Sequence, residues 1–225
     1  MKEQIENFRI AGLDYSLGCP AICFNGPDDD LFVDTFCYFK TSVKKYAKTF
    51  HIKKFKFIGS IHEQYYSEEQ RYDNLAWWVI NIQSEAQIKI IYLEDYSYSS
   101  TGRVFHIAEN TGVLKHQIWA SCWPYERLSG SSDEKQAEKD QREHRNYDTK
   151  IRLVAPTSVK KFATGKGNAS KWDMHDQFEK DTGINLSKEI TPNKAIATNP
   201  VNDIVDAYYI LKYGEHDALD REQLR

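Results

Sequence analysis

The fold of this chain is decided by one stretch near its end, Asn199-Pro200-Val201-Asn202-Asp203-Ile204-Val205-Asp206-Ala207, which predicts a helix over 200–213. Asn199 is a favourable N-cap, and Pro200 suits the first helical position. Asp203 and Asp206 are three residues apart, so they lie on one side of the helix about one turn apart. They interrupt an apolar run, and burying two like charges is costly unless a cation joins them. The alternative is a solvated acidic face on an amphipathic helix.

Two further acids end predicted strands. The segment Phe8–Ser16 reads as a buried strand with Asp14 near its C-terminal end, and 88–94 reads as a strand that ends in Glu94. Mg²⁺ prefers carboxylate and water oxygens, and two such ions about 4 Å apart can activate a water and stabilise a leaving oxygen in phosphodiester cleavage. Two strand-end carboxylates and two on a helix match this ligand set. The predicted catalytic and metal-binding residues are therefore Asp14, Glu94, Asp203 and Asp206.

Length and composition favour a single elaborated domain over 1–225. Hydrophobic residues make up 40% of the chain, which is enough for a sizeable core. No run is long and apolar enough to span a membrane, and the N-terminus lacks signal-peptide character, so we expect a cytoplasmic protein with no membrane partner. The four cysteines lack metal-binding spacing and read as reduced thiols, with a Cys19–Cys23 disulfide as the less favoured alternative.

The distribution of charge matters more than its sum. A net charge of −3 argues weakly against nucleic-acid binding, because phosphate neutralisation needs clustered Lys and Arg. Two stretches, 40–62 and 149–172, nevertheless carry many basic residues and no acid. Such stretches predict a phosphate-binding surface. Ordinary solvated faces are the alternative.

The order of elements predicts an α/β fold. Strands are expected at 7–14, 19–25, 31–39, 88–94 and 150–155, and helices at 72–80, 105–122 (broken near Gly112), 168–181 and 200–213. An antiparallel meander that feeds a parallel crossover is the ribonuclease H-like arrangement, here with a five-stranded mixed sheet flanked by helices. The segments 40–70, with a short strand around 52–58, and 121–148 read as insertions. The charged part of the second, 129–147, is expected to be a mobile loop or a solvated helix.

One segment resembles a known family. The sequence Ala155-Pro156-Thr157-Ser158-Val159-Lys160-Lys161-Phe162-Ala163-Thr164-Gly165-Lys166-Gly167-Asn168-Ala169-Ser170-Lys171 is similar to the strand-to-helix junction of RuvC-type Holliday junction resolvases. That family reads Pro, two residues, Val-Lys, then Thr-Gly-x-Gly-x-Ala-x-Lys. The resemblance covers 8–24, 88–114 and 150–209, and the four acids match the family's catalytic positions. Length and insertions look more like those of bacteriophage-encoded relatives.

The resemblance also implies a DNA-binding surface. Lys160 and Lys171 fall where the family keeps basic residues that contact phosphates near the scissile bond. Gly165 and Gly167 are expected to leave backbone N–H groups free to approach a phosphate, beside a helix that starts near Asn168. The predicted DNA-binding residues are Lys160, Lys161, Thr164, Gly165, Lys166, Gly167 and Lys171. The alternative is a tight αβ connection with a solvent-exposed lysine at 166.

The resemblance implies a structure-selective endonuclease that resolves four-way DNA junctions by paired symmetric nicks. It would use two Mg²⁺ ions per site, with Mn²⁺ as a substitute, and act as a homodimer through the helix at 72–80 or that at 105–120. If the chain is phage-encoded, it would act in the host cytoplasm. The alternatives are a less selective nuclease for branches and flaps in viral genome processing, and a non-catalytic DNA-binding relative. Four retained carboxylates argue against a pure binder, because they repel phosphate.

Two smaller predictions remain open. The aromatic residue that probes the junction is expected among Tyr96, Tyr98 and Phe105. Glu109 is expected to have an ordinary helix-terminal role, with support of the metal site from outside as the alternative. Ser16 lacks the surroundings of a serine nucleophile.

Overall fold

The computed structural model describes residues 9–26, 32–95, 104–121, 149–192 and 198–223. Its sheet has seven strands in the order β4-β5-β3-β2-β1-β6-β7. The strands are β1 Arg9–Asp14, β2 Ala21–Asn25, β3 Thr35–Thr41, β4 Thr49–Ile52, β5 Phe55–Ile61, β6 Ile88–Glu94 and β7 Lys150–Val154. The helices are η2 Lys44–Tyr46, α1 Glu68–Glu85, α2 Val104–Ser121, α4 Pro156–Thr164, α5 Lys171–Thr182, α6 Leu186–Ile190 and α7 Val201–Gln223.

The pairing of the strands brings five C-terminal ends to one edge of the sheet. The chain runs antiparallel from β1 to β2 and from β2 to β3. β5 lies parallel to β3, β6 lies parallel to β1, and β7 lies parallel to β6. Consequently β1, β3, β5, β6 and β7 all point the same way. The residues that directly follow these five strands therefore lie along a single edge of the sheet.

The prediction of a five-stranded sheet was wrong, because the segment 40–70 contributes two more strands, of which β5 corresponds to the short strand expected around 52–58. β4 and β5 form a hairpin that extends the sheet beyond β3. Its turn places Lys53 at φ 51°, a left-handed conformation that few residue types other than glycine adopt readily. The turn residues are Lys53 and Lys54, so the Asn-Gly or Asp-Gly pair that usually marks a tight hairpin in a sequence is missing here. That 40–70 is an insertion relative to the family stays a prediction, and 122–148 lies outside the described residues.

Several helices differ from their predicted bounds. α2 runs unbroken through Gly112, against the expected break, while its residues Leu114 and Ile118 are buried. α4 was missed because Pro156 was taken only as the end of a strand, whereas it occupies the first turn of a helix. α5 starts at Lys171 instead of 168, since Ser170 caps it through a capping box with Asp173. α6 was also missed.

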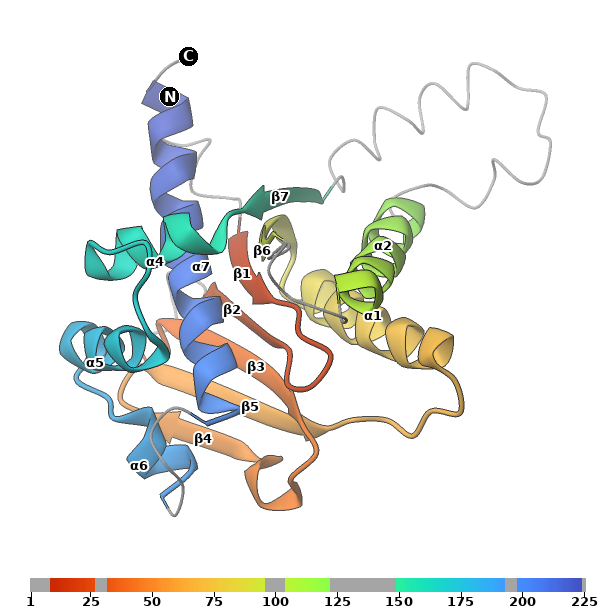
Figure 1. Ribbon diagram of the computed structural model, residues 1–225, viewed down its shortest axis with the longest axis horizontal. Coiled ribbons are helices and arrows are strands. Elements are labelled where there is room, and N and C mark those ends of the chain that lie inside the picture. Colours follow the sequence, from red (N-terminus) through yellow and green to blue (C-terminus); the bar gives the residue numbers. More distant parts are fainter. Residues whose placement is uncertain (1–8, 27–31, 96–103, 122–148, 193–197, 224–225) are drawn as a thin grey trace.

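Helices cover both faces of the sheet (Figure 1). One apolar core lies between the sheet and the helices α4, α5, α6 and α7, and the other lies between the sheet and the pair α1 and α2. α7 crosses β1 at Gly12, where an added Cβ would overlap backbone atoms of Ala207 and Leu211. Only glycine permits this approach. The close crossing holds the first turns of α7 beside the C-terminal end of β1.

The prediction of reduced cysteines was wrong for one pair. Cys23 and Cys37 face each other across β2 and β3 and form a disulfide. They are 14 residues apart, and only the strand register brings them together. Cys19 is free and buried, so the Cys19–Cys23 alternative was wrong as well. In the described part of the chain, no helix has both the length and the apolar character needed to cross a membrane.

Candidate active site

Two of the predicted acids end adjacent strands. β1 and β6 pair in parallel with Leu13 opposite Leu93, so the next residues, Asp14 and Glu94, end the two strands side by side. Even-numbered side chains of β1 point to the face covered by α7, because Ala11 and Leu13 belong to the opposite core. The side chain of Asp14 therefore points toward α7.

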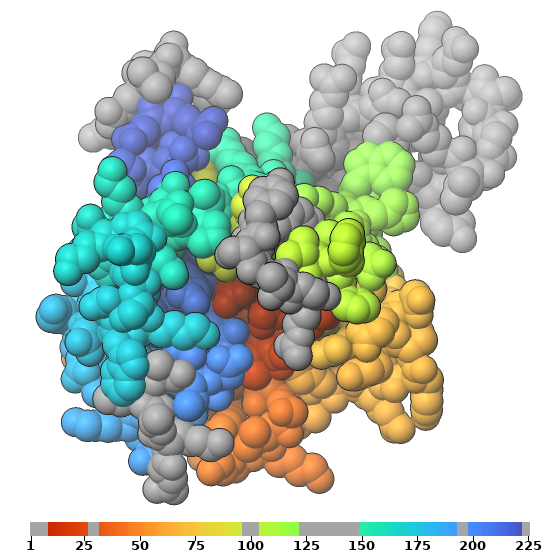
Figure 2. Space-filling model, in the orientation of Figure 1, coloured from red at the N-terminus to blue at the C-terminus, as the bar shows by residue number. Residues whose placement is uncertain are grey.

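The other two acids come from α7, which lies over β1. Asp203 is 6% exposed. Electrostatic repulsion links the four carboxylates, since the charges of Asp203, Glu94 and Asp206 all act on Asp14. In the space-filling view, red atoms from the segment that contains β1 are visible between the blue and cyan helices on one side and the green and orange ones on the other (Figure 2). The four acids predicted from sequence thus converge at one end of β1.

Burial and mutual repulsion disfavour ionisation of these acids. Burial, followed by the charge of Asp206, raises the pKa of both Glu94 and Asp203 to about 7. Burial also raises the pKa of Asp206 to about 6, and it raises that of Asp14 well above its ordinary value. Without a cation, the four groups therefore resist being charged together at neutral pH.

Two of the predicted basic residues act on the acids. Lys160 in α4 and Lys171 at the start of α5 both lower the pKa of Glu94 and of Asp206. Lys171 also acts on Asp14 and Asp203. These two lysines supply positive charge beside the carboxylates. Lys161 and Lys166 are exposed, and Lys166 acts on Asp173 instead.

The glycine segment is a turn between two helices. Gly165 ends α4 in the left-handed conformation, at φ 78°, and its N–H donates to the Lys161 carbonyl. Thr164 donates to the Lys160 carbonyl at 2.9 Å and accepts from the Lys166 N–H at 3.2 Å. The expectation that the N–H of Gly165 is free for a phosphate was therefore wrong. Capping of α4 already uses it.

A divalent cation fits the donor chemistry of the acids. Asp203 Oδ2 is buried and has no hydrogen-bond partner among the described residues. An orphaned buried carboxylate oxygen beside three other carboxylates is a strong acceptor for a cation. Within the described ranges, no group of three His, Cys, Asp or Glu side chains is arranged to hold a metal ion as it stands. The case for a divalent cation at this site therefore rests on the charge and the oxygen donors of the four acids.

Two residues that support the site were missed by the sequence analysis. Ser16 donates to Asp203 Oδ1 at 3.2 Å, and the N–H of Cys19 donates to Ser16 Oγ at 3.1 Å. This short chain fixes one oxygen of Asp203 and leaves the other open. Gly12 allows α7 to approach β1. The position of Ser16 two residues after a candidate metal-binding aspartate was the available signal.

The remaining candidates lie elsewhere. Glu109 accepts from Tyr72 OH at 3.3 Å and lies 3.5 Å from His106 Nδ1, so it joins α2 to α1. Phe105 is 78% exposed on α2. Tyr96 and Tyr98 lie outside the described residues.

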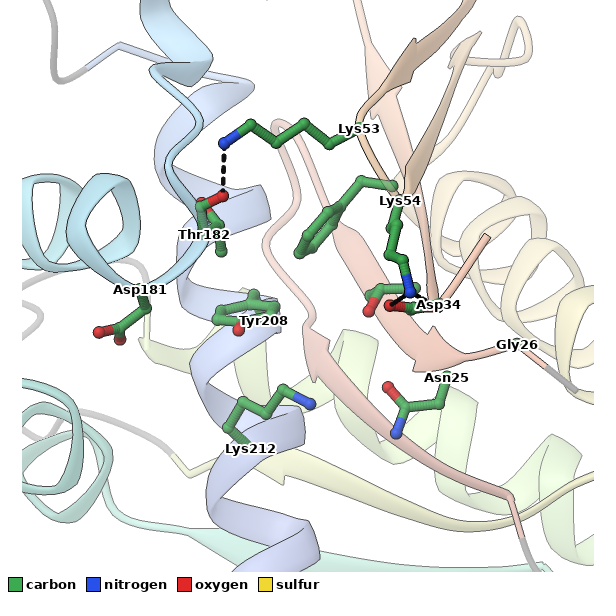
Figure 3. A pocket seen from close by; sticks show the side chains of 11 residues that line it. Asn25, Gly26, Asp34, Lys53, Lys54, Asp181, Thr182, Tyr208 and Lys212 are labelled. Carbon is green, nitrogen blue, oxygen red and sulfur yellow. Dashed lines mark hydrogen bonds and ion pairs between the residues drawn. The ribbon is translucent and has the colours of Figure 1, made fainter. Parts of the chain in front are cut away.

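A pocket of about 590 Å³ opens at the other end of β2, around Asn25 (Figure 3). Lys53 donates to the Thr182 carbonyl at 3.0 Å, and Lys54 pairs with Asp34 at 3.1 Å. Ala21, which pairs with Asp14, is four residues from Asn25, or about 14 Å along the strand. The pocket is therefore separate from the acids, and these two lysines already have partners.

Comparison with known proteins relates the chain to others by structure alone. Neither a family model nor a curated protein sequence matches it. Thermus thermophilus RuvC is similar over 94% of this chain and 97% of its own, with 10% identity and a TM-score of 0.51. T. thermophilus RuvC in complex with a Holliday junction substrate is similar over the same shares, with 10% identity and a TM-score of 0.52. The yeast mitochondrial Holliday junction resolvase Ydc2 covers 91% of this chain and 77% of its own, with 13% identity and a TM-score of 0.49.

The two Thermus structures show that this chain has the RuvC fold. An α/β architecture with a mixed sheet flanked by helices was predicted and is confirmed. Origin in a bacteriophage stays a prediction.

Proposed function

We propose that the protein is a Mg²⁺-dependent, structure-selective DNA endonuclease that resolves four-way junctions. One observation carries the proposal. The carboxylates of Asp14, Glu94, Asp203 and Asp206 converge at the end of β1, beside Lys160 and Lys171, in a chain with the RuvC fold. A neighbour with this fold was solved in complex with a Holliday junction substrate.

The reaction is hydrolysis of a phosphodiester. A water oxygen bonds to phosphorus, and the bond to the 3′ oxygen breaks, which leaves a 5′-phosphate and a 3′-hydroxyl. Two Mg²⁺ ions held by the four acids would supply a nucleophilic water and stabilise the leaving oxygen. Mn²⁺ is expected to substitute.

The protein's own residues prepare this site. Lys160 and Lys171 neutralise part of the carboxylate charge and bind the phosphate. Ser16 holds Asp203 in one orientation. Burial of the acids keeps their surroundings poor in water, which strengthens each of these electrostatic interactions.

A homodimer suits a substrate that needs two symmetric cuts. α1 and α2 lie together on one face of the sheet (Figure 1), and both carry exposed large aromatic side chains. Trp77 on α1 is 51% exposed, and Phe105 on α2 is 78% exposed. Exposed aromatics of this kind are enriched at protein interfaces. We place the dimer surface on these two helices.

The test compares labelled four-way junctions, flaps and linear duplex with Mg²⁺ or EDTA. Paired nicks in the junction alone, dependent on Mg²⁺, support the proposal. Equal cutting of flaps favours the less selective nuclease. Binding without cutting in Mg²⁺ would overturn the catalytic role. Asp176→Asn, which changes an exposed acid of α5, is the matched control and should cut like wild type.

A further inference from the structure

A row of paired residues connects the acids to the far side of the sheet. Asp14 in β1 lies opposite Ala21 in β2, Ala21 lies opposite Phe39 in β3, and Phe39 lies opposite Gly59 in β5. Neighbouring strands are about 4.8 Å apart, so the row from Asp14 to Gly59 spans about 14 Å. Asp14 and Gly59 therefore lie at the same height along the direction of the strands.

The segment 43–48, which we call the lysine turn, packs on the end of this row. The N–H of Gly59 donates to the Lys48 carbonyl at 3.0 Å, and a Cβ at Gly59 would overlap the Tyr46 carbonyl. Tyr46 is 3% exposed and belongs to the core that also contains Phe39 and residues of α7. The lysine turn is therefore anchored on the face of the sheet that carries α7 and the side chain of Asp14.

The charges of the lysine turn are uncompensated. Lys44, Lys45 and Lys48 are exposed, and none forms an ion pair within the described residues. Lys45 Nζ lies 4.9 Å from the ring centre of Tyr46, and Lys48 Nζ lies 5.0 Å from that of Phe50. No acid occurs between residues 35 and 62, and Glu63 is paired with Lys40. Cation–π contacts thus hold the ammonium groups of Lys45 and Lys48 without neutralising their charge.

We infer that the lysine turn binds the phosphate backbone of a DNA duplex arm, on the opposite side of the acids from Lys160 and Lys171. This inference rests on the proposed function, because the acids define where the scissile phosphate lies. Duplex DNA rises 3.4 Å per base pair, so a distance of about 14 Å corresponds to about four base pairs. Contacts of this kind position the substrate and read no sequence.

The first experiment measures the salt dependence of binding to a four-way junction in EDTA. The variant Lys44→Gln/Lys45→Gln removes two exposed charges. We expect it to bind more weakly and to lower the slope of log affinity against log salt by about two. The matched control is Lys180→Gln/Lys188→Gln, which alters two exposed lysines outside both basic stretches, one near the end of α5 and one in α6. The control should keep the wild-type slope.

A second experiment locates the contact. Single neutral methylphosphonates replace each phosphate in turn on either side of the cut site. Wild type should lose affinity where the replacement is about three to five base pairs away, and Lys44→Gln/Lys45→Gln should be insensitive there. Equal slopes and equal sensitivity of the two proteins would overturn the inference.

Failure of the inference is distinguishable from failure of the proposed function. If wild type cuts junctions in Mg²⁺ while the variant keeps the wild-type slope, only the inference fails. If wild type does not cut but the variant lowers the slope, the proposed function fails and DNA binding by the lysine turn stands.

Discussion

Replacing Asp203 by asparagine is expected to stabilise the metal-free protein, increasingly so as the pH rises. Asp203 is 6% exposed, and burial together with the charge of Asp206 raises its pKa from 3.8 to about 7. The folded state therefore holds the proton more tightly than the unfolded state. Stability falls as the pH rises from 3.8 toward 7, because ionising this group costs more in the folded protein.

The size of the effect follows from the shift in pKa. A change from 3.8 to about 7 is about three pKa units, and each unit is worth about 1.36 kcal/mol. Asparagine mimics the neutral acid and keeps an oxygen for the hydrogen bond from Ser16. The expected gain in free energy of unfolding is about 1–2 kcal/mol at pH 5 and about 4 kcal/mol at pH 8.

Urea unfolding in EDTA at both pH values measures this gain. Asp176→Asn, an exposed control on α5, should change stability by less than about 0.5 kcal/mol at either pH. Saturating Mg²⁺ at pH 8 should stabilise wild type by about 2.7 kcal/mol at a concentration of 100 times Kd, and it should stabilise the variant less. A variant no more stable than wild type at pH 8, or a gain that does not grow with pH, would show that Asp203 is not held with a raised pKa in the folded protein.

Four further substitutions test the site and the fold around it. Asp14→Asn should abolish cleavage and leave junction binding intact, since it removes a ligand and a repelling charge, and wild-type nicking in Mg²⁺ would refute the metal assignment. Gly12→Ala should destabilise the protein by about 1–3 kcal/mol in urea unfolding, because its Cβ would overlap the backbone of α7. Gly112→Ala, with nothing within 4 Å of the added Cβ, should stabilise it by about 0.5–1 kcal/mol. Ser16→Ala should weaken Mg²⁺ binding by about 10- to 100-fold in calorimetry, and unchanged affinity would count against its positioning role.

The local pattern of the chain was enough to choose the four acids. Asp203 and Asp206 stand out because helical spacing places both on one side of a largely apolar helix. Asp14 and Glu94 stand out because each ends a buried strand. An α/β fold with a mixed sheet was also predictable, since an antiparallel meander followed by parallel crossovers leaves few arrangements. The RuvC fold was implied by the resemblance of the segment 155–171. The roles of these residues in catalysis stay predictions.

The features that were not predicted from the sequence depend on tertiary contacts. Gly12 looks like any glycine in a strand until α7 is packed on it. The parallel pairing of β5 with β3 joins segments whose own sequences carry no mark of it. Likewise, the pair Cys23 and Cys37 depends on the register of β2 and β3. The Gly165 turn was predicted as a phosphate cradle because its use as a helix cap is visible only once α4 is known.

The proposed function depends on the four carboxylates holding paired divalent ions. It is tested most directly by anomalous scattering from crystals of the protein soaked in Mn²⁺. Two anomalous peaks about 4 Å apart are expected, both within bonding distance of carboxylates among Asp14, Glu94, Asp203 and Asp206. A fully soaked crystal with no peak at the end of β1, or with Mn²⁺ bound only elsewhere, would contradict it.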